Sequence, residues 1–361
     1  MINYAKRNPI KEKSAIILIY HFSKRSKYFL KVLSENNLVI ERIIPIPYSA
    51  QKSVIDELSN EYNVTLVSSL DDIPRVALKA LEDAVKRYDK VVLLEIGGYC
   101  AECINKFASS NLKGVVECTA QGHWRYGREQ LMLPVISTAK AMLNLAHYPA
   151  IALDVLQVLN QVLGEVFYDT LAGKIVGILG YGNLGKACVR VLQGYPCKVL
   201  TYDIEPIRRI EAFLDGYYVD KEELLKNADI IIGATGNYSI RGTEFLKLKD
   251  GVILASATSR QVEFDIDSLN SITKEKTNIN SLVTLYRLNN NKKIYLLNDG
   301  YPINFKHMYL GALEDLLFTM HYEAVRILLE NDWSPGLHEL PYDSMNNIAK
   351  TWLRYYVEKN K

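Results

Sequence analysis

One glycine-rich loop has the residue types and the spacing that bind a diphosphate. The loop has GxGxxG spacing and reads Gly180, Tyr181, Gly182, Asn183, Leu184 and Gly185. In such a loop the first glycine permits a tight turn, the second lets the backbone approach the pyrophosphate, and the third lets a helix pack closely against a strand. Free backbone N–H groups and the helix dipole then face the anion. The loop predicts a dinucleotide site, and the alternative is a glycine turn with only a structural role.

A carboxylate after the loop indicates which dinucleotide is bound. Asp203 follows Gly185 by eighteen residues, where its oxygens can accept hydrogen bonds from the ribose hydroxyls of an adenosine. The same charge would repel a 2′-phosphate, so NAD is favoured over NADP. Arg208 and Arg209 either soften this preference or are solvated on the following helix.

The segments around the loop are those that must position it. Residues 174–179 form a short apolar run suited to a buried strand, 186–192 have helical apolar spacing, and 197–202 form a second strand that ends at Asp203. Further elements expected in this half are helices around 206–214 and 222–227, strands at 229–233 and 251–255, and a hairpin over 285–297 that turns at 289–291.

The N-terminal part alternates strand-like and helix-like segments, which is typical of a parallel sheet with helices on both faces. Strands are expected at 15–20, 38–46, 64–67, 91–96 and 114–119, and helices at 26–35, 54–62, 73–88 and 101–108. A connecting helix is expected at 150–167, and closing helices are expected at 310–329 and 346–357.

This pattern predicts an α/β protein with two doubly wound, Rossmann-like domains and mostly parallel sheets. The expected substrate domain spans residues 1–150, and the C-terminal helices in 306–361 return to it. The expected NAD-binding domain spans residues 151–305.

Composition excludes some classes of function. Lysine and arginine total 43 against 41 acids, for a formal charge of +2, so no nucleic-acid footprint is indicated. No apolar run approaches the roughly 18 residues that span a bilayer, and the polar N-terminus is unlike a signal peptide. We therefore expect a cytoplasmic protein with a small-molecule substrate and neither a nucleic-acid nor a membrane partner.

The five cysteines do not form a disulfide framework, because they are odd in number and spread through a long chain. Cys100 and Cys103 have CxxC spacing, and Cys118 with His123 would be needed to complete a metal site. The alternative, which we favour because no second CxxC exists, is a pair of small thiols at the start of a helix. No metal is expected.

Several motifs resemble those of the S-adenosylhomocysteine hydrolases in order and spacing. In the cofactor half they are residues 180–186, Tyr202 to Pro206, Ala234-Thr235-Gly236-Asn237, Val262 to Asp265, Tyr286 to Leu288, and residues 294–300 with Asn304. In the N-terminal half they are His21, Gly97-Gly98, Glu117 with Thr119, and Leu133-Pro134.

The resemblance implies a tightly bound NAD, a homo-oligomer, and a reaction at a ribose hydroxyl. In that family the alcohol is oxidised, a 5′ substituent is eliminated next to the resulting ketone, water adds, and the ketone is reduced again. Oxidation of an alcohol also needs a base for the hydroxyl proton, and elimination needs further acid–base groups.

Three positions depart from the family pattern. Tyr99 replaces an acid after the double glycine, Cys118 replaces a glutamate that would hold sugar hydroxyls, and Ser259 replaces a histidine. These replacements argue against hydrolysis of adenosylhomocysteine itself.

The catalytic candidates come from the same comparison. His21 matches an active-site histidine and follows the first strand, where doubly wound folds place ligands; the alternative is a surface histidine at a helix start. A family lysine and aspartate four residues apart fall on Asn144 and Tyr148 when the alignment has no gap, and both are then lost. With a gap of one helical turn, Lys140 and Asn144 reproduce the spacing, with the acid changed to an amide. Lys140 would act as a base if burial lowered its pKa, and the alternative is a solvated lysine.

The last three candidates have weaker support. His307 lies near a family histidine, but the loop before it is shortened. Thr119 and Asn304 match positions on the nicotinamide side, and both are otherwise ordinary loop residues.

Two hypotheses follow. The first is an NAD-dependent enzyme that oxidises, transiently or as a net reaction, an alcohol of a nucleoside-like or other polar metabolite. The second is a non-catalytic NAD-binding regulator of the same architecture.

Overall fold

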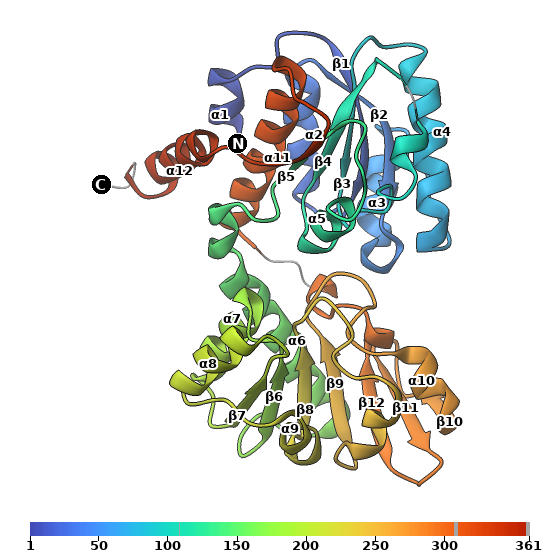
Figure 1. Cartoon of the computed structure of the whole chain (residues 1–361), viewed down its shortest axis with the longest axis vertical. Coiled ribbons are helices and arrows are strands. Elements are labelled where there is room, and N and C mark those ends of the chain that lie inside the picture. The colour runs from blue at the N-terminus through green and yellow to red at the C-terminus, as the bar shows by residue number, and fades with distance from the viewer. Residues whose placement is uncertain (108, 307–309, 359–361) are drawn as a thin grey trace. The chain divides into compact units, whose positions relative to one another are not determined.

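The computed structural model describes residues 1–107, 109–306 and 310–358, which form two compact units (Figure 1). Unit 1 comprises Met1–Leu145 and Gly311–Lys361, and unit 2 comprises Ala146–Leu310. The chain therefore passes between the units within a few residues of the boundaries expected at 150 and 305.

Unit 1 is built on a six-stranded parallel sheet with the order β13-β5-β4-β3-β1-β2. Its central strands are apolar and buried on both faces, as a parallel sheet covered by helices requires. The strands are β1 (Ser14–Tyr20), β2 (Leu38–Pro45), β3 (Val91–Glu95), β4 (Leu112–Glu117), β5 (Pro134–Ser137) and β13 (Gly336–Glu339).

Helices cover both faces of this sheet. In Figure 1, α4 and α11 flank the strands from opposite sides, α4 against β1, β2 and β3, and α11 against β3, β4 and β5. The helices of unit 1 are α1 (Ile2–Arg7), α2 (Ser26–Glu35), α3 (Lys52–Ser59), α4 (Ile73–Val85), α5 (Ala120–Tyr126), α11 (Ala312–Glu330) and α12 (Tyr342–Tyr356). Because the strand order reverses between β1 and β3, the carboxyl ends of these strands are where a ligand is expected to bind.

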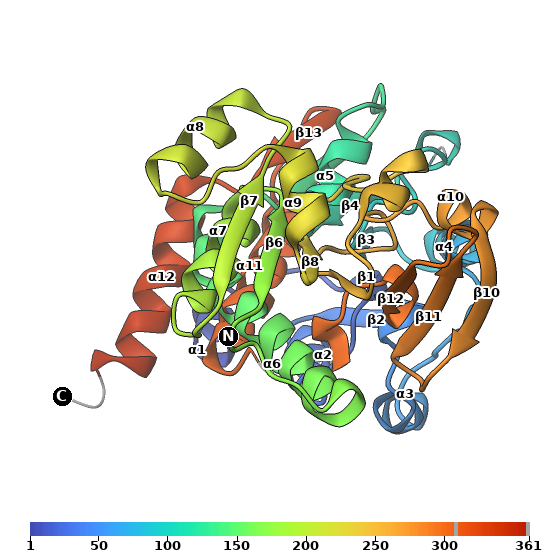
Figure 2. The same cartoon turned by 90° about the horizontal axis from the view of Figure 1, so that it is seen from below.

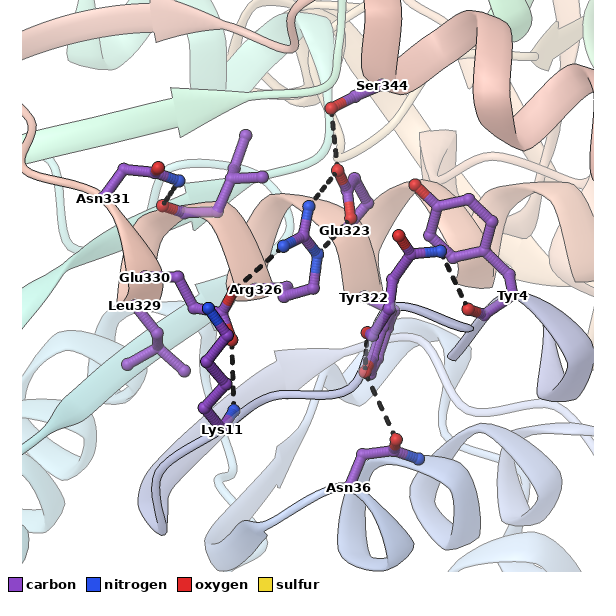
Figure 3. A network of polar contacts seen from close by, with 12 residues as sticks. Tyr4, Lys11, Asn36, Tyr322, Glu323, Arg326, Leu329, Glu330, Asn331 and Ser344 are labelled. Atoms are coloured by element: carbon purple, nitrogen blue, oxygen red, sulfur yellow. Dashed lines mark hydrogen bonds and ion pairs between the residues drawn. The ribbon is translucent and has the colours of Figure 1, made fainter. Parts of the chain in front are cut away.

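A polar network fixes the C-terminal helices to unit 1 (Figure 3). Arg326 of α11 donates to Glu323 at 2.7 Å and to Glu330 at 3.0 Å, and both carboxylates are buried or nearly so. Ser344 of α12 donates to Glu323 at 2.7 Å, and the backbone N–H of Lys11 donates to Glu330 at 3.1 Å. The prediction that the C-terminal helices return to the first domain is confirmed.

Unit 2 contains a seven-stranded sheet with the order β10-β11-β12-β9-β8-β6-β7. The strands β7, β6, β8, β9 and β12 are parallel to one another, and β11 and β10 extend the sheet beyond β12 in antiparallel pairing (Figure 2). Tyr218 forms a parallel bridge to Thr201 of β7 and so stands where a further strand would lie. The strands are β6 (Ile175–Leu179), β7 (Lys198–Tyr202), β8 (Ile230–Gly233), β9 (Val252–Ser256), β10 (Thr273–Asn278), β11 (Val283–Leu288) and β12 (Lys293–Leu297).

This order places the topological switch point between β6 and β8, which is the position of the nucleotide crevice in Rossmann sheets. The helices of unit 2 are α6 (Tyr148–Phe167), α7 (Asn183–Leu192), α8 (Pro206–Leu214), α9 (Lys221–Asn227) and α10 (Ile266–Ser271). The predicted fold class, two doubly wound domains with mostly parallel sheets, is confirmed.

One helical stretch among the described residues, Met142–Phe167, is long and apolar enough by length and composition to cross a membrane. The expectation from sequence that no stretch approaches this length was therefore wrong by that test. The buried face of α6, which includes Val155, Leu159 and Val162, packs in the core of unit 2. Core helices can have the same length and apolar composition as a membrane-spanning helix.

Some expected elements differ. Residues 64–67 form no strand and contribute only a bridge between Val64 and Ile43. The helix expected at 101–108 is wrong over its described part, which forms turns and a 3-10 helix, Ile104–Lys106. Strands β5, β10 and β13 were not predicted, because β10 is polar and largely exposed and β5 and β13 have only four residues each.

Candidate functional site

The glycine loop of unit 2 connects β6 to α7, and each of its three glycines has a distinct steric environment. Gly180 has φ +102°, and a Cβ there would lie 2.7 Å from the carbonyl oxygen of Ala234. A Cβ on Gly185 would lie 1.9 Å from the carbonyl oxygen of Gly180, so helix and loop pack in direct contact. A Cβ on Gly182 would meet no atom of a described residue within 4 Å. Gly180 and Gly185 thus serve the fold, whereas Gly182 leaves space for a ligand.

Helix α7 begins at Asn183 directly after Gly182, and among the described residues no side chain caps it. The first N–H groups of an α-helix have no partner within the helix. The backbone at Asn183 and Leu184 is therefore suited to hold an anion that approaches over Gly182. The loop fits the pyrophosphate of a dinucleotide.

Asp203 lies at the carboxyl end of β7, beside this loop. Its Oδ2 accepts a hydrogen bond from the backbone N–H of Tyr181 at 2.6 Å, and its Oδ1 accepts one from the backbone N–H of Glu205 at 2.8 Å. These bonds orient a half-buried carboxylate that retains lone pairs for ribose hydroxyls.

The loop Thr235, Gly236 and Asn237 follows β8, on the other side of the switch point. The buried carboxylate of Glu263 accepts hydrogen bonds from the backbone N–H groups of Thr235 and Gly236 at 2.8 and 2.6 Å. It also accepts from the hydroxyls of Thr235 at 2.8 Å and Thr258 at 2.6 Å. Burial raises the pKa of Glu263, and these donors oppose the rise. Glu263 therefore positions the loop that would contact the cofactor.

Asn304 lies at the same edge of the sheet, because the preceding Ile303 donates to the backbone of Ser256 at the end of β9. Its side-chain oxygen Oδ1 is buried and has no hydrogen-bond partner among the described residues. A buried polar atom left without a partner is costly, so Asn304 is a fitting contact for a bound cofactor. The structure thus gathers the predicted cofactor residues of unit 2 on one edge.

The candidate residues of unit 1 also lie at the carboxyl ends of neighbouring strands. His21 follows β1 and is buried, and its Nδ1 lies 2.5 Å from the Ser49 hydroxyl that follows β2. Burial lowers the pKa of His21 to about 3. The alternative of a surface histidine is thereby wrong, and the imidazole is neutral at physiological pH.

Two buried glutamates end β3 and β4. Glu117 accepts from the backbone N–H groups of Gly97 and Gly98 at 3.1 and 2.8 Å. Glu95 accepts from the hydroxyl of Tyr126 and from the backbone N–H of Tyr99, the latter at 2.9 Å. Burial raises the pKa of Glu95 to about 7, and burial and the charge of Glu95 raise that of Glu117 to about 8. These carboxyls hold the double-glycine loop.

Two of the three substituted positions, Tyr99 and Cys118, lie beside this pair. Tyr99 is buried, and burial raises the pKa of its phenol. Burial, followed by the charge of Glu117, raises the pKa of the Cys118 thiol, so it stays protonated and is a poor nucleophile. The hydroxyl of Thr119 donates to Glu117 at 2.8 Å and accepts from Gly122 as the N-cap of α5. Thr119 therefore has a structural role within unit 1.

Lys140 is not buried, contrary to the condition under which it would act as a base. Its side chain is 56% exposed, and its Nζ lies 3.6 Å from the Glu339 carboxylate. The physical reason is that β13 pairs with β5, so Glu339 ends beside the loop that carries Lys140. Asn144 donates to the carbonyls of Thr138 and Ala139 at 2.7 and 3.1 Å and so braces that loop. His307 lies outside the described residues.

The cysteine pair follows the double-glycine loop. Cys100 is buried, Cys103 is partly buried, and all five cysteines are free thiols. Within residues 1–107, 109–306 and 310–358, no group of three His, Cys, Asp or Glu side chains is placed to hold a metal ion.

The glycine loop, the helix N-terminus and Asp203 define unit 2 as an NAD-binding Rossmann domain. Residues 165–308 match the family described as S-adenosyl-L-homocysteine hydrolase, NAD binding domain. Over this domain the chain is similar to the S-adenosylhomocysteine hydrolases, and the cofactor of the domain is NAD.

Relatives match over the same half. An S-inosyl-L-homocysteine hydrolase from Methanopyrus kandleri is 34% identical over 187 residues, which are 50% of this chain and 44% of the relative. An adenosylhomocysteinase from Saccharolobus solfataricus is 36% identical over 190 residues, 51% of this chain and 46% of the relative. The match thus spans about half the length of these curated relatives.

Among solved structures, an NAD⁺-bound 3-phosphoglycerate dehydrogenase from Entamoeba histolytica aligns over 96% of both chains, with 13% identity and a TM-score of 0.45. That degree of similarity supports no inference about function.

Three residues of the unit 1 site were missed from sequence: Tyr48, Ser49 and Glu95. Glu95 is the last residue of an apolar strand, and a carboxylate at that position could have been recognised from sequence as a candidate site residue. Tyr48 and Ser49 lie in a 3-10 helix, Pro47–Ser49, directly after β2. The sequence could have indicated these two residues only by their position directly after a strand, where doubly wound sheets bind ligands.

Proposed function

We propose that this protein is an NAD-dependent enzyme of the S-adenosylhomocysteine hydrolase type. It oxidises, transiently or as a net reaction, an alcohol of a nucleoside-like or other polar metabolite. The observation that carries the proposal is the combination of a fitting NAD site in unit 2 with a buried, neutral histidine at the switch point of unit 1.

In this proposal the chain's own residues bind and orient. The backbone at Gly182 and Asn183 holds the pyrophosphate, Asp203 accepts from the adenosine ribose, and Asn304 supplies a buried amide oxygen. NAD, when bound, supplies the acceptor for the hydride of the alcohol.

The substrate side belongs to unit 1. His21 offers an uncharged imidazole, and Glu95 and Glu117 hold the double-glycine loop in place with carboxyls that titrate near neutral pH. Tyr99 and Cys118, which stay protonated, offer neutral O–H and S–H groups in place of two family carboxylates. A ligand with fewer hydrogen-bond donors at that point than adenosylhomocysteine is therefore favoured.

The proposal is tested by incubating the NAD-loaded protein with a panel of nucleosides and polyols. Reduced nicotinamide is followed by its absorbance, and exchange of substrate hydrogen with deuterated water is followed by NMR. We expect reduction or exchange with at least one compound, and loss of the signal in His21→Ala while NAD binding persists. Neither signal across the panel would overturn the enzyme proposal.

A second candidate, a non-catalytic NAD-binding regulator, is favoured by one observation. Lys140 pairs with Glu339 at the surface, and no burial prepares it as a base. Turnover that disappears in His21→Ala or Lys140→Ala, with NAD affinity unchanged, would rule this candidate out.

We include a homo-oligomer in the proposal. An apolar row on α8 is exposed by 60 to 75%, and the row consists of Ile207, Ile210, Phe213 and Leu214. Exposed apolar patches of this kind mark association surfaces, and a second copy of the chain is the proposed occupant. Light scattering of Ile210→Glu beside the unaltered protein tests it, and an unchanged mass would count against this surface.

A further inference from the structure

Cys100 and Cys103, the pair that follows the double-glycine loop, take no part in the proposed function. Both are free thiols, and Cys100 is buried whereas Cys103 is partly exposed. The pair lies shortly after β3, at the carboxyl edge of the unit 1 sheet. A chemical change at these thiols would therefore occur in the region where doubly wound sheets bind ligands.

A tight turn of the backbone brings the two cysteines together. The backbone N–H groups of Cys103 and Ile104 donate to the carbonyl oxygen of Cys100 at 3.0 and 2.8 Å. A turn closed between residues i and i+3 holds their Cα atoms within about 7 Å, and disulfides join Cα atoms about 4.4–6.8 Å apart. The turn thus gives the pair a spacing that suits a disulfide.

The side chains of the pair also face one another. The Sγ of Cys103 points back over the turn and donates to the carbonyl oxygen of Cys100 at 3.4 Å. The thiol of Cys100 in turn donates to the sulfur of Cys103. Because the two sulfurs are in hydrogen-bond contact, an S–S bond requires only a small shift of the side chains.

The two thiols differ in acidity and in access. The hydrogen bond from Cys100 holds the pKa of Cys103 below its ordinary value and outweighs the opposing effect of burial. The same bond, followed by burial, raises the pKa of Cys100. Since the thiolate is the nucleophilic form, the partly exposed Cys103 is the thiol that reacts first with a solute.

We propose that Cys100 and Cys103 form a reversible redox modification site, at which a peroxide oxidises the two thiols to an intramolecular disulfide. Cys103 is the attacking residue, and Cys100 is the resolving residue behind it. The site does not depend on the proposed enzymatic function, because its thiols react whether or not unit 1 turns over a substrate.

The reaction balances over two steps. The Cys103 thiolate attacks one oxygen of hydrogen peroxide, the O–O bond breaks, and Cys103 becomes a sulfenic acid while hydroxide leaves. The sulfur of Cys100 then attacks the sulfur of Cys103, so the S–O bond breaks and the S–S bond forms. The second oxygen leaves as water with the proton of Cys100, and the hydroxide takes up the proton that Cys103 released. The two thiols lose two electrons, and the peroxide gains them.

The disulfide would restrain the loop that carries Tyr99. The backbone N–H groups of Tyr99 and Cys100 donate to the buried carboxylate of Glu95 at 2.9 and 3.3 Å. Cys100 is thereby held against the sheet, so Cys103 is the residue that shifts when the bond forms. We expect the amides of Tyr99 and Cys100 to exchange hydrogen more slowly in the oxidised protein, because the cross-link opposes local opening.

The first test treats the full-length, NAD-loaded protein with hydrogen peroxide, alkylates the remaining thiols and maps the peptides by mass spectrometry. We expect the peptide with Cys100 and Cys103 to lose the mass of two hydrogen atoms and to regain it with dithiothreitol. Cys188, which is buried, should be recovered as a thiol. Recovery of Cys100 and Cys103 as thiols, or a disulfide from either to Cys118 or to another chain, would overturn the proposal.

The second test separates the roles of the two cysteines. Without peroxide, iodoacetamide should alkylate Cys103 about tenfold faster than Cys100. In Cys100→Ala the sulfenic acid of Cys103 should persist and be trapped by dimedone, whereas in Cys103→Ala the thiol of Cys100 should survive the same peroxide treatment. Cys197→Ala, at a partly buried cysteine of unit 2, is the matched control and should form the disulfide at an unchanged rate. Oxidation of Cys100 as fast in Cys103→Ala as in the unaltered protein would contradict the assigned order of attack.

Discussion

The carboxylate of Glu263 accepts a 2.6 Å hydrogen bond from the backbone N–H of Gly236, so a buried acid holds the loop that follows β8. Glu117 does the same in unit 1, where it accepts from Gly98 at 2.8 Å. Each acid fits only because a glycine faces it: a Cβ on Gly233 would lie 2.7 Å from Glu263, and one on Gly122 would lie 1.9 Å from Glu117. Both units thus position a ligand loop with an internal carboxylate.

Replacing Glu263 should weaken NAD binding in a graded way. Glu263→Gln keeps one oxygen for the two backbone donors, whereas Glu263→Ala leaves both without a buried acceptor. Because charged hydrogen bonds contribute about 1.5–3 kcal/mol, we expect NAD affinity to fall roughly tenfold in the glutamine variant and further in the alanine variant. Calorimetric titration measures it, with Glu222→Gln, at an exposed glutamate, as control. Equal affinity in all variants would contradict the positioning role.

Two glycines of the same loop should respond in opposite ways. Gly182→Ala adds a methyl where no atom of a described residue lies within 4 Å, so folding should be preserved while NAD affinity falls at least tenfold. Gly185→Ala drives a methyl against the carbonyl oxygen of Gly180 and should destabilise unit 2 by about 2 kcal/mol or more. Thermal unfolding with and without NAD separates the two effects. A Gly182→Ala protein that binds NAD normally would show that the pyrophosphate does not approach there.

The sequence was most informative where a pattern has one physical solution. GxGxxG between an apolar run and a helix, followed by Asp203, predicts a strand, turn, helix and strand, and β6, α7 and β7 form as expected. The alternation of buried strands and amphipathic helices predicts both parallel sheets, because a strand buried on both faces is apolar throughout.

The sequence was least informative where tertiary contacts decide. Lys140 has no local signal that separates a buried base from an exposed lysine, and its pairing with Glu339 depends on β13, which lies about 200 residues further along the chain. The contact between His21 and Ser49 likewise depends on the side-by-side placement of β1 and β2. Only the paired sheet brings such residues together.

Asp203 should set the preference for NAD over NADP. Asp203→Ser removes the charge that would repel a 2′-phosphate while a hydroxyl remains near the N–H of Tyr181. We expect the ratio of NADP to NAD dissociation constants to fall about tenfold or more, mainly because NADP binds better. Competition titrations measure the ratio, and Asp220→Ser, at the exposed start of α9, is the control. A preference for NAD that survives in Asp203→Ser would assign the discrimination to other groups.

The buried pair Glu95 and Glu117 should make stability depend on pH. Burial raises the pKa of Glu95 to about 7 and that of Glu117 to about 8 in the folded protein, against 4.5 for a free glutamate. Between pH 4.5 and about 8 the folded state therefore binds more protons than the unfolded state, so the free energy of unfolding falls as pH rises through that window. At about 1.4 kcal/mol per pKa unit, the loss is about 3 kcal/mol for Glu95 and about 5 kcal/mol for Glu117.

Glu95→Gln should flatten this decline. A glutamine can donate to the Tyr126 hydroxyl and still accept from the N–H of Tyr99, and the charge that raises the pKa of Glu117 is gone. Melting temperatures from pH 4.5 to 8.5 test this, with Glu82→Gln, 53% exposed on α4, as the matched control. A decline as steep in Glu95→Gln as in the unaltered protein would mean that other groups bind the protons. In that case Glu95 would be ionised throughout, and the hydrogen bonds it accepts from Tyr99 and Tyr126 would outweigh its burial.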